Sequence, residues 1–441
     1  MTGQRFEIEG GHPIGGAIAP AGNKNAALPL LAATLLTDEE VVLHNVPMIR
    51  DVKALLEILS GIGVSISDRG KGTIALKASG VNGAEADPKL AKQIRASILL
   101  AGPMLARRGR VRLPPPGGDV IGRRRIDTHV LGLEALGAKF HATPDTFSFS
   151  LEGRLKGTEI FLDEASVTGT ENIIMAAALA EGTTTIMNAA SEPHVQELCA
   201  LINAMGGHIQ GVGTNTLVIE GVPKLHGAEH RLGPDYIEVG SLIVLAAVTG
   251  GELLLKGCHA SDLRSARIAF GRLGIRFEVA KSPTGAGEDL LVRGGQELRV
   301  ESDIQNAIPK IEDAPWPGFP ADLTSIVVVA ATQSEGTVLI HEKMFESRLF
   351  FVDKLVSMGA RIILCDPHRA LVYGPSLLRA GTVESPDIRA GMAMLIAALC
   401  AQGKSTILNV GQIERGYERI GSRLRALGAH IEEVEDRRSR R

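Results

Sequence analysis

The sequence predicts an α/β protein of two lobes, each built from three similar repeats. Three observations lead to this prediction. A helix-ending phrase with a glycine recurs six times, an alanine-rich apolar segment accompanies each recurrence, and 441 residues exceed what one hydrophobic core usually holds. We therefore expect one lobe over residues 23–234 and the other over residues 235–441. The repeat spacing leaves open which lobe takes the opening strand, residues 5–10.

The recurring phrase has the form apolar–x–x–apolar–Gly–small. Glycine after an amphipathic helix fits a left-handed position that ends the helix, and the alternating residues that follow read as a strand. The six copies are LLEILSGIGVSI (55–66), LEALGAKF (133–140), LINAMGGHI (201–209), FGRLGIRF (270–277), KLVSMGARI (354–362) and LRALGAHI (424–431). Their shared glycines are Gly63, Gly137, Gly206, Gly274, Gly359 and Gly428, which lie 68 to 85 residues apart.

The accompanying segments are apolar almost all round. A helix without a polar face has no place at the surface, so we expect these six helices to be buried. They cover residues 23–36, 94–106, 170–180, 238–250, 321–333 and 388–402. A short turn and a β-branched stretch follow, as in EGTTTIMN (181–188), so each repeat reads helix, strand, helix, strand.

Composition excludes several classes of protein. The formal charge is −3, so no overall positive field attracts nucleic acid or acidic lipid, and we expect no partner of either kind. The four cysteines form no CxxC pair, which argues against a zinc site or a disulfide framework. No signal peptide and no apolar run of the roughly 20 residues that span a bilayer are visible. We expect a cytoplasmic protein without a bound metal, and the oligomeric state stays open.

Functional residues are expected where one repeat departs from the others. The phrase GNKN puts Lys24 at the start of an apolar helix, where free N–H groups and an ammonium together favour an anion. The alternative is a lysine that flanks the helix and extends into water.

The segment RRGRVRLPPPGGDVIGRRRIDTH (107–129) is the second departure. It reads as a poorly regular loop, mobile over about residues 110–125, with seven arginines and Asp119 at its tip. Nucleic-acid binding is a rival interpretation, but the segment has no aromatic side chain on which bases could stack. A phosphate-bearing small molecule fits better, and a solvated run of charges remains the plain alternative.

Further departures lie in the second lobe. Asp322 opens a buried helix, where it could simply be a cap. Arg389 and Arg415 are predicted at helix starts, where a cation opposes the helix dipole unless it binds an anion, and FESR adds Arg348. Asp387 could be only the ion-pair partner of Arg389. Arginines suit bidentate contacts with carboxylate and phosphate, so cations from both lobes predict an anionic ligand.

Eight phrases in order resemble the enolpyruvyl transferases, and among them the UDP-N-acetylglucosamine 1-carboxyvinyltransferase family. They are GNKNAALPLLAATLL, IRASILLAGP, PGGDVIGRRRIDTH, SVTGTEN, GFPADL, FESR, DIRAG and ERGYERI, and the similarity runs from about residue 5 to residue 434. The resemblance implies two inside-out α/β barrel lobes, each of three pseudo-symmetric repeats with buried helices. It also implies that residues 1–22 join residues 235–441 in the C-terminal lobe.

The implied reaction transfers the enolpyruvyl group of phosphoenolpyruvate to the 3-hydroxyl of UDP-N-acetylglucosamine and releases phosphate, without a cofactor or metal. By resemblance, Asp119 donates a proton to the methylene carbon and Asp322 binds the sugar hydroxyl as the candidate base. The implied substrate contacts are Lys24, Arg124 and Arg415 for phosphate, Arg348 and Arg389, beside Asp387, for carboxylate, Asn25 and Arg95 for the sugar diphosphate, Met344 for the sugar, and Arg124, Arg125, Ile126, Asp127, Thr128, His129, Ser166 and Val167 for uridine.

Three positions depart from the family pattern. Many members have cysteine where this chain has Asp119, many have proline where it has Arg125, and some have lysine where it has Glu164. Because the last two fall at the implied uridine site, nucleotide preference is less secure than the chemistry. Two alternative functions remain: enolpyruvyl transfer to another acceptor such as shikimate 3-phosphate, and a non-catalytic homologue that binds the nucleotide sugar.

Overall fold

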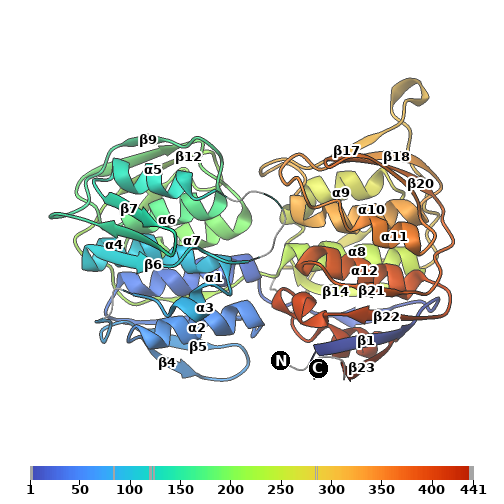
Figure 1. Ribbon diagram of the computed structural model, residues 1–441, viewed down its shortest axis with the longest axis horizontal. Coiled ribbons are helices and arrows are strands. Elements are labelled where there is room, and N and C mark those ends of the chain that lie inside the picture. The colour runs from blue at the N-terminus through green and yellow to red at the C-terminus, as the bar shows by residue number, and fades with distance from the viewer. Residues whose placement is uncertain are drawn as a thin grey trace. The chain divides into compact units, whose positions relative to one another are not determined.

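The computed structural model describes residues 3–82, 85–118, 122, 125–283, 285 and 287–436. The described chain forms a mixed α/β fold with two compact units (Figure 1). One, here called the terminal unit, combines the residues up to Ala21 with those from Pro234 onward. The other, the middle unit, covers Gly22–Gly233 except Gly122, which belongs to the terminal unit.

The middle unit combines helices with three sheets. Its α-helices are α1 (Lys24–Ala33), α2 (Arg50–Gly61), α3 (Pro88–Ala91), α4 (Ala101–Arg108), α5 (Asp127–Ala135), α6 (Val167–Ala177) and α7 (Pro193–Ala204), and its 3₁₀ helices are η1 (Thr34–Leu36) and η2 (Arg95–Leu100). Its strands are β3 (Glu40–His44), β4 (Ser65–Asp68), β5 (Ile74–Lys77), β6 (Arg110–Leu113), β7 (Lys139–Thr143), β8 (Thr146–Ser150), β9 (Glu159–Phe161), β10 (Thr183–Met187), β11 (His208–Gln210), β12 (Thr216–Glu220) and β13 (Glu229–Arg231).

The terminal unit has the same ingredients. Its α-helices are α8 (Tyr236–Thr249), α9 (Arg264–Gly271), α10 (Thr324–Gln333), α11 (Val352–Ser357), α12 (Ile388–Cys400) and α13 (Ile420–Ala426), with 3₁₀ helices η3 (Ala260–Leu263), η4 (Ile304–Asn306), η5 (Ala321–Leu323) and η6 (Val410–Arg415). Its strands are β1 (Gly3–Glu9), β2 (Gly16–Ile18), β14 (Leu253–Cys258), β15 (Glu278–Lys281), β16 (Glu288–Val292), β17 (Lys310–Glu312), β18 (Gly336–His341), β19 (Arg361–Asp366), β20 (Arg369–Gly374), β21 (Thr382–Glu384), β22 (Lys404–Leu408) and β23 (His430–Asp436).

Five of the six sheets in the described chain share one pairing pattern. A short strand pairs in parallel with a second strand, which pairs antiparallel with a third, and the third with a fourth. The sheets run β13-β3-β5-β4, β9-β10-β12-β11, β2-β14-β16-β15, β17-β18-β20-β19 and β21-β22-β1-β23. The sixth sheet of the described chain, β6-β8-β7, has three strands. Where the other sheets have the short parallel strand, it has an isolated parallel bridge between Glu85 and Arg112.

The third strand of the last sheet comes from the opposite end of the sequence. Strand β1 lies between β22 and β23 and pairs antiparallel with both (Figure 1). Phe6 and Ile8 on β1 are fully buried, whereas Glu9 lies on the exposed side of the strand. The alternation of apolar and polar residues in RFEIE therefore fixes which face of the strand packs on the core.

The buried helices predicted from the alanine-rich segments are confirmed. Helices α8, α10 and α12 pack on one another, and each is buried on every side over most of its length. In the middle unit, α1 and α6 are likewise buried. The predicted helix 94–106 is instead the 3₁₀ helix η2 followed by α4. A continuous α-helix would place Pro103 in its interior, where proline removes a hydrogen bond and clashes with the preceding turn.

The six glycines of the recurring phrase all adopt positive φ, between 80° and 104°. In five cases the glycine follows the helix C-cap directly, and Gly274 lies one residue further on. This confirms the prediction that these glycines end helices in the left-handed conformation.

The loop predicted over residues 107–129 is wrong in its first part. Arg107 and Arg108 end α4, Gly109 caps it in the left-handed conformation, and residues 110–113 form β6. Arg107 pairs with Asp38 at 2.6 Å. The alternation in RVRL was a strand signal that the density of arginines obscured. Asp119, Arg123 and Arg124 lie outside the described residues.

Candidate active site

Lys24 is the first residue of α1, in the middle unit. Asn23 caps the helix, because its side-chain oxygen accepts the backbone N–H groups of Asn25 and Ala26. The Lys24 ammonium lies 2.9 Å from Oδ2 of Asp51 in α2, and both side chains are buried. A lysine that merely flanked the helix would extend into water, so the structure contradicts that alternative. The sequence offered no signal for Asp51.

The segment after the arginine-rich run is held by side chains from two other places. Arg95, at the start of η2, donates from Nη2 to the carbonyl oxygen of Arg125 at 2.9 Å. Arg125 pairs with Asp127 at 3.1 Å and with Asp163 at 3.4 Å, and Asp127 raises the pKa of the Arg125 guanidinium. Thr128 donates to the other oxygen of Asp163 at 2.7 Å. Arg95 and Asp163 thus fix the backbone at residues 125–128.

Two glycines let the proline-rich segment approach the backbone around Arg95. A Cβ atom at Gly117 would lie 1.8 Å from the carbonyl oxygen of Lys92, and one at Gly118 would lie 2.9 Å from Cβ of Arg95. Only glycine allows this approach of backbone to backbone. The described residues up to Gly118 therefore lie against residues 92–95.

Residues predicted to contact uridine are adjacent in the structure. Ser166 caps α6 and accepts the N–H of Gly169 at 3.3 Å, and Val167 is the first residue of that helix. A Cβ atom at Gly169 would meet Ser166 and the methyl group of Thr128, so the starts of α5 and α6 touch. Ile126 precedes α5 as its N-cap residue without a capping side chain.

His129 is buried in a hydrogen-bond network that sequence reasoning missed. Asn172 on α6 accepts the N–H of Gly102 at 2.7 Å and donates to the carbonyl oxygen of Ile98 at 2.8 Å, which fixes its amide orientation. The same amide nitrogen lies 2.8 Å from Nδ1 of His129, so Nδ1 accepts and Nε2 carries the proton toward Thr168 at 3.1 Å. Burial, with Arg95 nearby, lowers the pKa of His129 to about 3.

This low pKa predicts a pH-dependent stability. His129 is neutral in the folded protein, whereas an unfolded histidine titrates near pH 6.5, so below that pH the unfolded chain binds more protons. The His129 contribution is therefore fully present above pH 6.5 and is lost as the pH falls toward about 3, by about 1.4 kcal/mol per pH unit. Urea unfolding from pH 7 to pH 4 measures the slope.

The variants His129→Gln and His208→Ala serve as test and control for that slope. His129→Gln removes the titrating group and should flatten it, whereas His208→Ala removes an exposed imidazole and should leave it unchanged. Equal slopes for wild type and His129→Gln would contradict the assignment.

In the terminal unit, Asp322 bridges two buried arginines. Its Oδ1 accepts from Nη2 of Arg348 at 3.1 Å, and its Oδ2 accepts from Nη2 and Nε of Arg389 at 2.8 and 3.0 Å. The arginine side chains are 3% and 5% exposed, whereas that of Asp322 is 30% exposed. Asp322 lies within η5, and its contacts are those of an ion-pair partner, so the interpretation as a mere cap is wrong.

A second carboxyl group, that of Glu342, lies near Arg348. Glu342 lies 3.7 Å from Nε of Arg348, and its other oxygen accepts the N–H groups of Met344 and Phe345 at 3.3 and 3.1 Å. Burial, reinforced by neighbouring Asp313, raises the pKa of Glu342 well above its usual range. Asp313 accepts the Met344 N–H as well, at 3.3 Å. The two acids fix the turn that places Met344, whose side chain is exposed.

Arg389 is the second residue of α12, as predicted. Its neighbour Asp387 caps that helix by accepting the N–H groups of Arg389 and Ala390. The Arg389 guanidinium lies 5.5 Å from the centroid of the Tyr417 ring, and its Nη1 has no hydrogen-bond partner within the described chain. A buried guanidinium with a spare donor is suited to an anionic ligand.

The predicted position of Arg415 at a helix start is wrong. Arg415 is the last residue of η6, and the next helix, α13, begins at Ile420. ERGYERI lacks the side chain that would cap a helix at Arg415, and a cation at a C-terminal end is favourable without any ligand. Its Nη1 donates to Gln412 at 3.0 Å.

Known proteins share this fold over the whole chain. The enolpyruvyl transferase NikO from Streptomyces tendae has a TM-score of 0.86 at 24% identity and covers 99% of this chain and 100% of its own. EPSP synthase from Acinetobacter baumannii has a TM-score of 0.76 at 19% identity, covering 98% of this chain and 100% of its own. A family model described as EPSP synthase (3-phosphoshikimate 1-carboxyvinyltransferase) matches residues 8–424. The fold is thus that of the enolpyruvyl transferases.

Relatives with similar sequences identify the family more narrowly. UDP-N-acetylglucosamine 1-carboxyvinyltransferase from Treponema denticola is 57% identical, over 97% of this chain and 98% of its own. The protein of that name from Bradyrhizobium diazoefficiens is 55% identical over the full length of both chains. The chain belongs to the UDP-N-acetylglucosamine 1-carboxyvinyltransferase family. Within the described residues, no helix has the length and apolar character needed to cross a membrane.

Proposed function

We propose that the protein is a cytoplasmic transferase that moves the enolpyruvyl group of phosphoenolpyruvate to the 3-hydroxyl of UDP-N-acetylglucosamine, the first committed step of peptidoglycan synthesis. No cofactor or metal takes part. The supporting observation is the pair of buried arginines on Asp322, with a spare guanidinium donor, in a chain 57% identical to a relative of that name.

The reaction is an addition followed by an elimination. The sugar oxygen bonds to C2 of phosphoenolpyruvate while the methylene carbon takes a proton, which forms a tetrahedral ketal. The ketal then loses a proton from that methyl group and phosphate from C2, so the double bond returns. An acid must serve the carbon and a base the hydroxyl. We assign the acid to Asp119 and the base to Asp322, the solvent-accessible member of its cluster.

Cationic side chains hold the anionic groups in this proposal. Lys24, Arg124 and Arg415 bind the phosphate, and Arg348 and Arg389 bind the carboxylate, with Asp387 beside them. Charge that is already oriented in the folded protein stabilises a transition state without further reorganisation. Asp51 acts through Lys24, which it holds in an ion pair, and Glu342 holds the turn that carries Met344.

The nucleotide sugar is assigned to the remaining residues. Asn25 and Arg95 contact the sugar and diphosphate, Met344 packs on the sugar, and the uridine contacts are Arg124, Arg125, Ile126, Asp127, Thr128, His129, Ser166 and Val167. His129, a buried neutral imidazole, acts by holding α5 against α6. The ion pairs of Arg125 with Asp127 and Asp163 supply a reason for arginine where relatives of this family often have proline.

We also propose that each unit is an inside-out α/β barrel of three pseudo-symmetric repeats, with lobes at 23–234 and at 1–22 plus 235–441. The repeated strand-pairing pattern and the six left-handed glycines support the repeats. The contact division at Ala21 and Gly233 supports the lobes.

Phosphate release from phosphoenolpyruvate tests the function. Release should require UDP-N-acetylglucosamine, and Lys24→Ala should lower it by about 10²-fold or more, as expected for loss of a preorganised charge. Lys53→Ala, an exposed lysine on α2, is the matched control and should keep full activity. Release with shikimate 3-phosphate instead would favour the alternative acceptor, and no release with either would refute both.

A further inference from the structure

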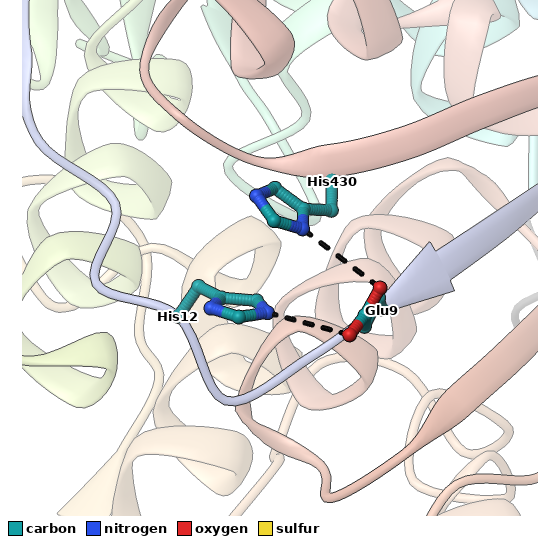
Figure 2. A group of neighbouring side chains, drawn as sticks. All are labelled: Glu9, His12 and His430. Atoms are coloured by element: carbon teal, nitrogen blue, oxygen red, sulfur yellow. Dashed lines mark ion pairs between the residues drawn. The ribbon is translucent and has the colours of Figure 1, made fainter.

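Two histidines and a glutamate gather where the first and last strands meet. Glu9 ends β1, His12 follows three residues later, and His430 begins β23 (Figure 2). Nε2 of His12 lies 3.8 Å from one oxygen of Glu9, and Nδ1 of His430 lies 3.9 Å from the other. Figure 2 shows both imidazoles directed toward the same carboxylate. Donor atoms of three side chains thus lie close together.

Strand register explains how residues so far apart in sequence come together. Glu9 is directly opposite His430 in the antiparallel pair β1–β23, and Ile8 is opposite Ile431. The isoleucines are buried, so the alternation of the strands turns Glu9 and His430 outward. The chain turns back after β1, and the His12 and His430 rings lie 4.2 Å apart, between centroids, at 30°.

These donors suit a particular class of cation. Imidazole nitrogen and carboxylate oxygen are the ligands that Zn²⁺ and its first-row neighbours take, and two histidines with one glutamate is a known set for zinc with water as the fourth ligand. One ligand atom from each side chain can be chosen so that all three lie within 4.8 Å of one another. Bonds of about 2.0–2.2 Å draw such atoms closer still, which partly exposed side chains permit.

The charged side chains next to the three donors balance one another. Glu7 and Glu432 are opposite one another on the same outward face of β1 and β23, next to the pair of Glu9 and His430. Arg5 contacts Glu7 at 2.9 Å, and Lys404 on β22 contacts Glu7 at 2.9 Å and Glu432 at 4.0 Å, so two cations offset the charge of these two acids. The affinity for a divalent cation therefore has to come from the two imidazoles and the carboxylate themselves.

We propose that Glu9, His12 and His430 form a binding site for a zinc-type divalent cation that joins the first strand of the chain to the last. The site is separate from the residues assigned to the reaction. Because the three ligands come together only when β1 and β23 are paired, the ion binds the folded terminal unit and stabilises it.

Titration of the metal-free full-length protein with Zn²⁺ tests the proposal, by calorimetry for stoichiometry and by thermal unfolding for stabilisation. Cys365→Ser serves as the parent, because Cys365 is an exposed thiol that could bind Zn²⁺ itself. We expect one equivalent of Zn²⁺ to bind and raise Tm. His12→Ala, His430→Ala and Glu9→Gln should each weaken binding by at least about 10-fold and remove the rise in Tm, since even an outer-shell partner contributes that much.

His208→Ala is the matched control. His208 begins β11 at the same place in the recurring phrase, GGHI, that His430 has in GAHI before β23, and it is also exposed. Its removal should leave Zn²⁺ affinity and the Tm rise unchanged. A parent without saturable Zn²⁺ binding, or equal binding by the His430→Ala and His208→Ala variants, would overturn the proposal. Both readouts are independent of catalysis.

Discussion

Asp322→Ala should both abolish catalysis and lower the free energy of unfolding by about 3–5 kcal/mol. The substitution leaves Arg348 and Arg389 buried without their shared carboxylate, and an uncompensated buried charge carries a penalty of that order. Chemical unfolding by urea measures the loss of stability, and phosphate release measures the loss of activity. Asp322→Asn keeps the shape and one acceptor oxygen, so it should recover part of the stability while activity stays low.

Asp366→Ala provides a matched control in the same unit. The Asp366 side chain is 29% exposed, close to the 30% of Asp322, and it also pairs with an arginine, Arg369 at 2.6 Å. That arginine is 55% exposed, so water screens the pair and its loss should cost little stability. If Asp322→Ala destabilised the protein no more than Asp366→Ala, the buried pairing of Asp322 would not have the energetic role assigned to it.

Asp119→Ala should lower kcat by about 10²–10⁴-fold, the usual contribution of a positioned general acid. Asp119→Cys should retain activity, because a thiol can donate the same proton. The acid must be protonated to act, so kcat falls as the pH rises through its pKa. Cysteine has the higher reference pKa, about 8.5 against about 3.9, and this limb should move to higher pH in Asp119→Cys.

Covalent inhibition also distinguishes aspartate from cysteine at position 119. An epoxide that alkylates thiols should inactivate Asp119→Cys in a time-dependent manner and leave the parent active. Full activity of Asp119→Ala, or covalent inactivation of the parent by the epoxide, would contradict the role of Asp119.

Local features of the fold were predictable because their causes are local. A glycine at the end of an amphipathic helix is enough to predict positive φ, as at Gly63 and Gly428, and a helix without a polar face is enough to predict burial. Lys24 could be recognised as unusual because it is a charged residue at the start of an otherwise apolar helix. Such signals lie within one turn or one helix of the residue concerned.

Features that depend on distant contacts were not predictable. Asn172 and His129 are 43 residues apart, and Asp322 and Arg389 are 67 residues apart, so no spacing rule connects them. Glu342 and Asp51 look like ordinary surface acids in sequence. The prediction for Arg415 failed for a local reason. Its arginine suggested an anion site at a helix start, but the sequence around it contains no residue that would cap a helix there, and Arg415 ends η6 instead.

The position of β1 has a consequence for how the chain is made. On the ribosome the first strand emerges long before β22 and β23, its two neighbours. The intervening residues of the middle unit, up to Gly233, are complete while β1 still lacks both partners. Vectorial synthesis therefore lets the middle unit fold early, whereas the terminal unit closes only after the last strand has left the exit tunnel.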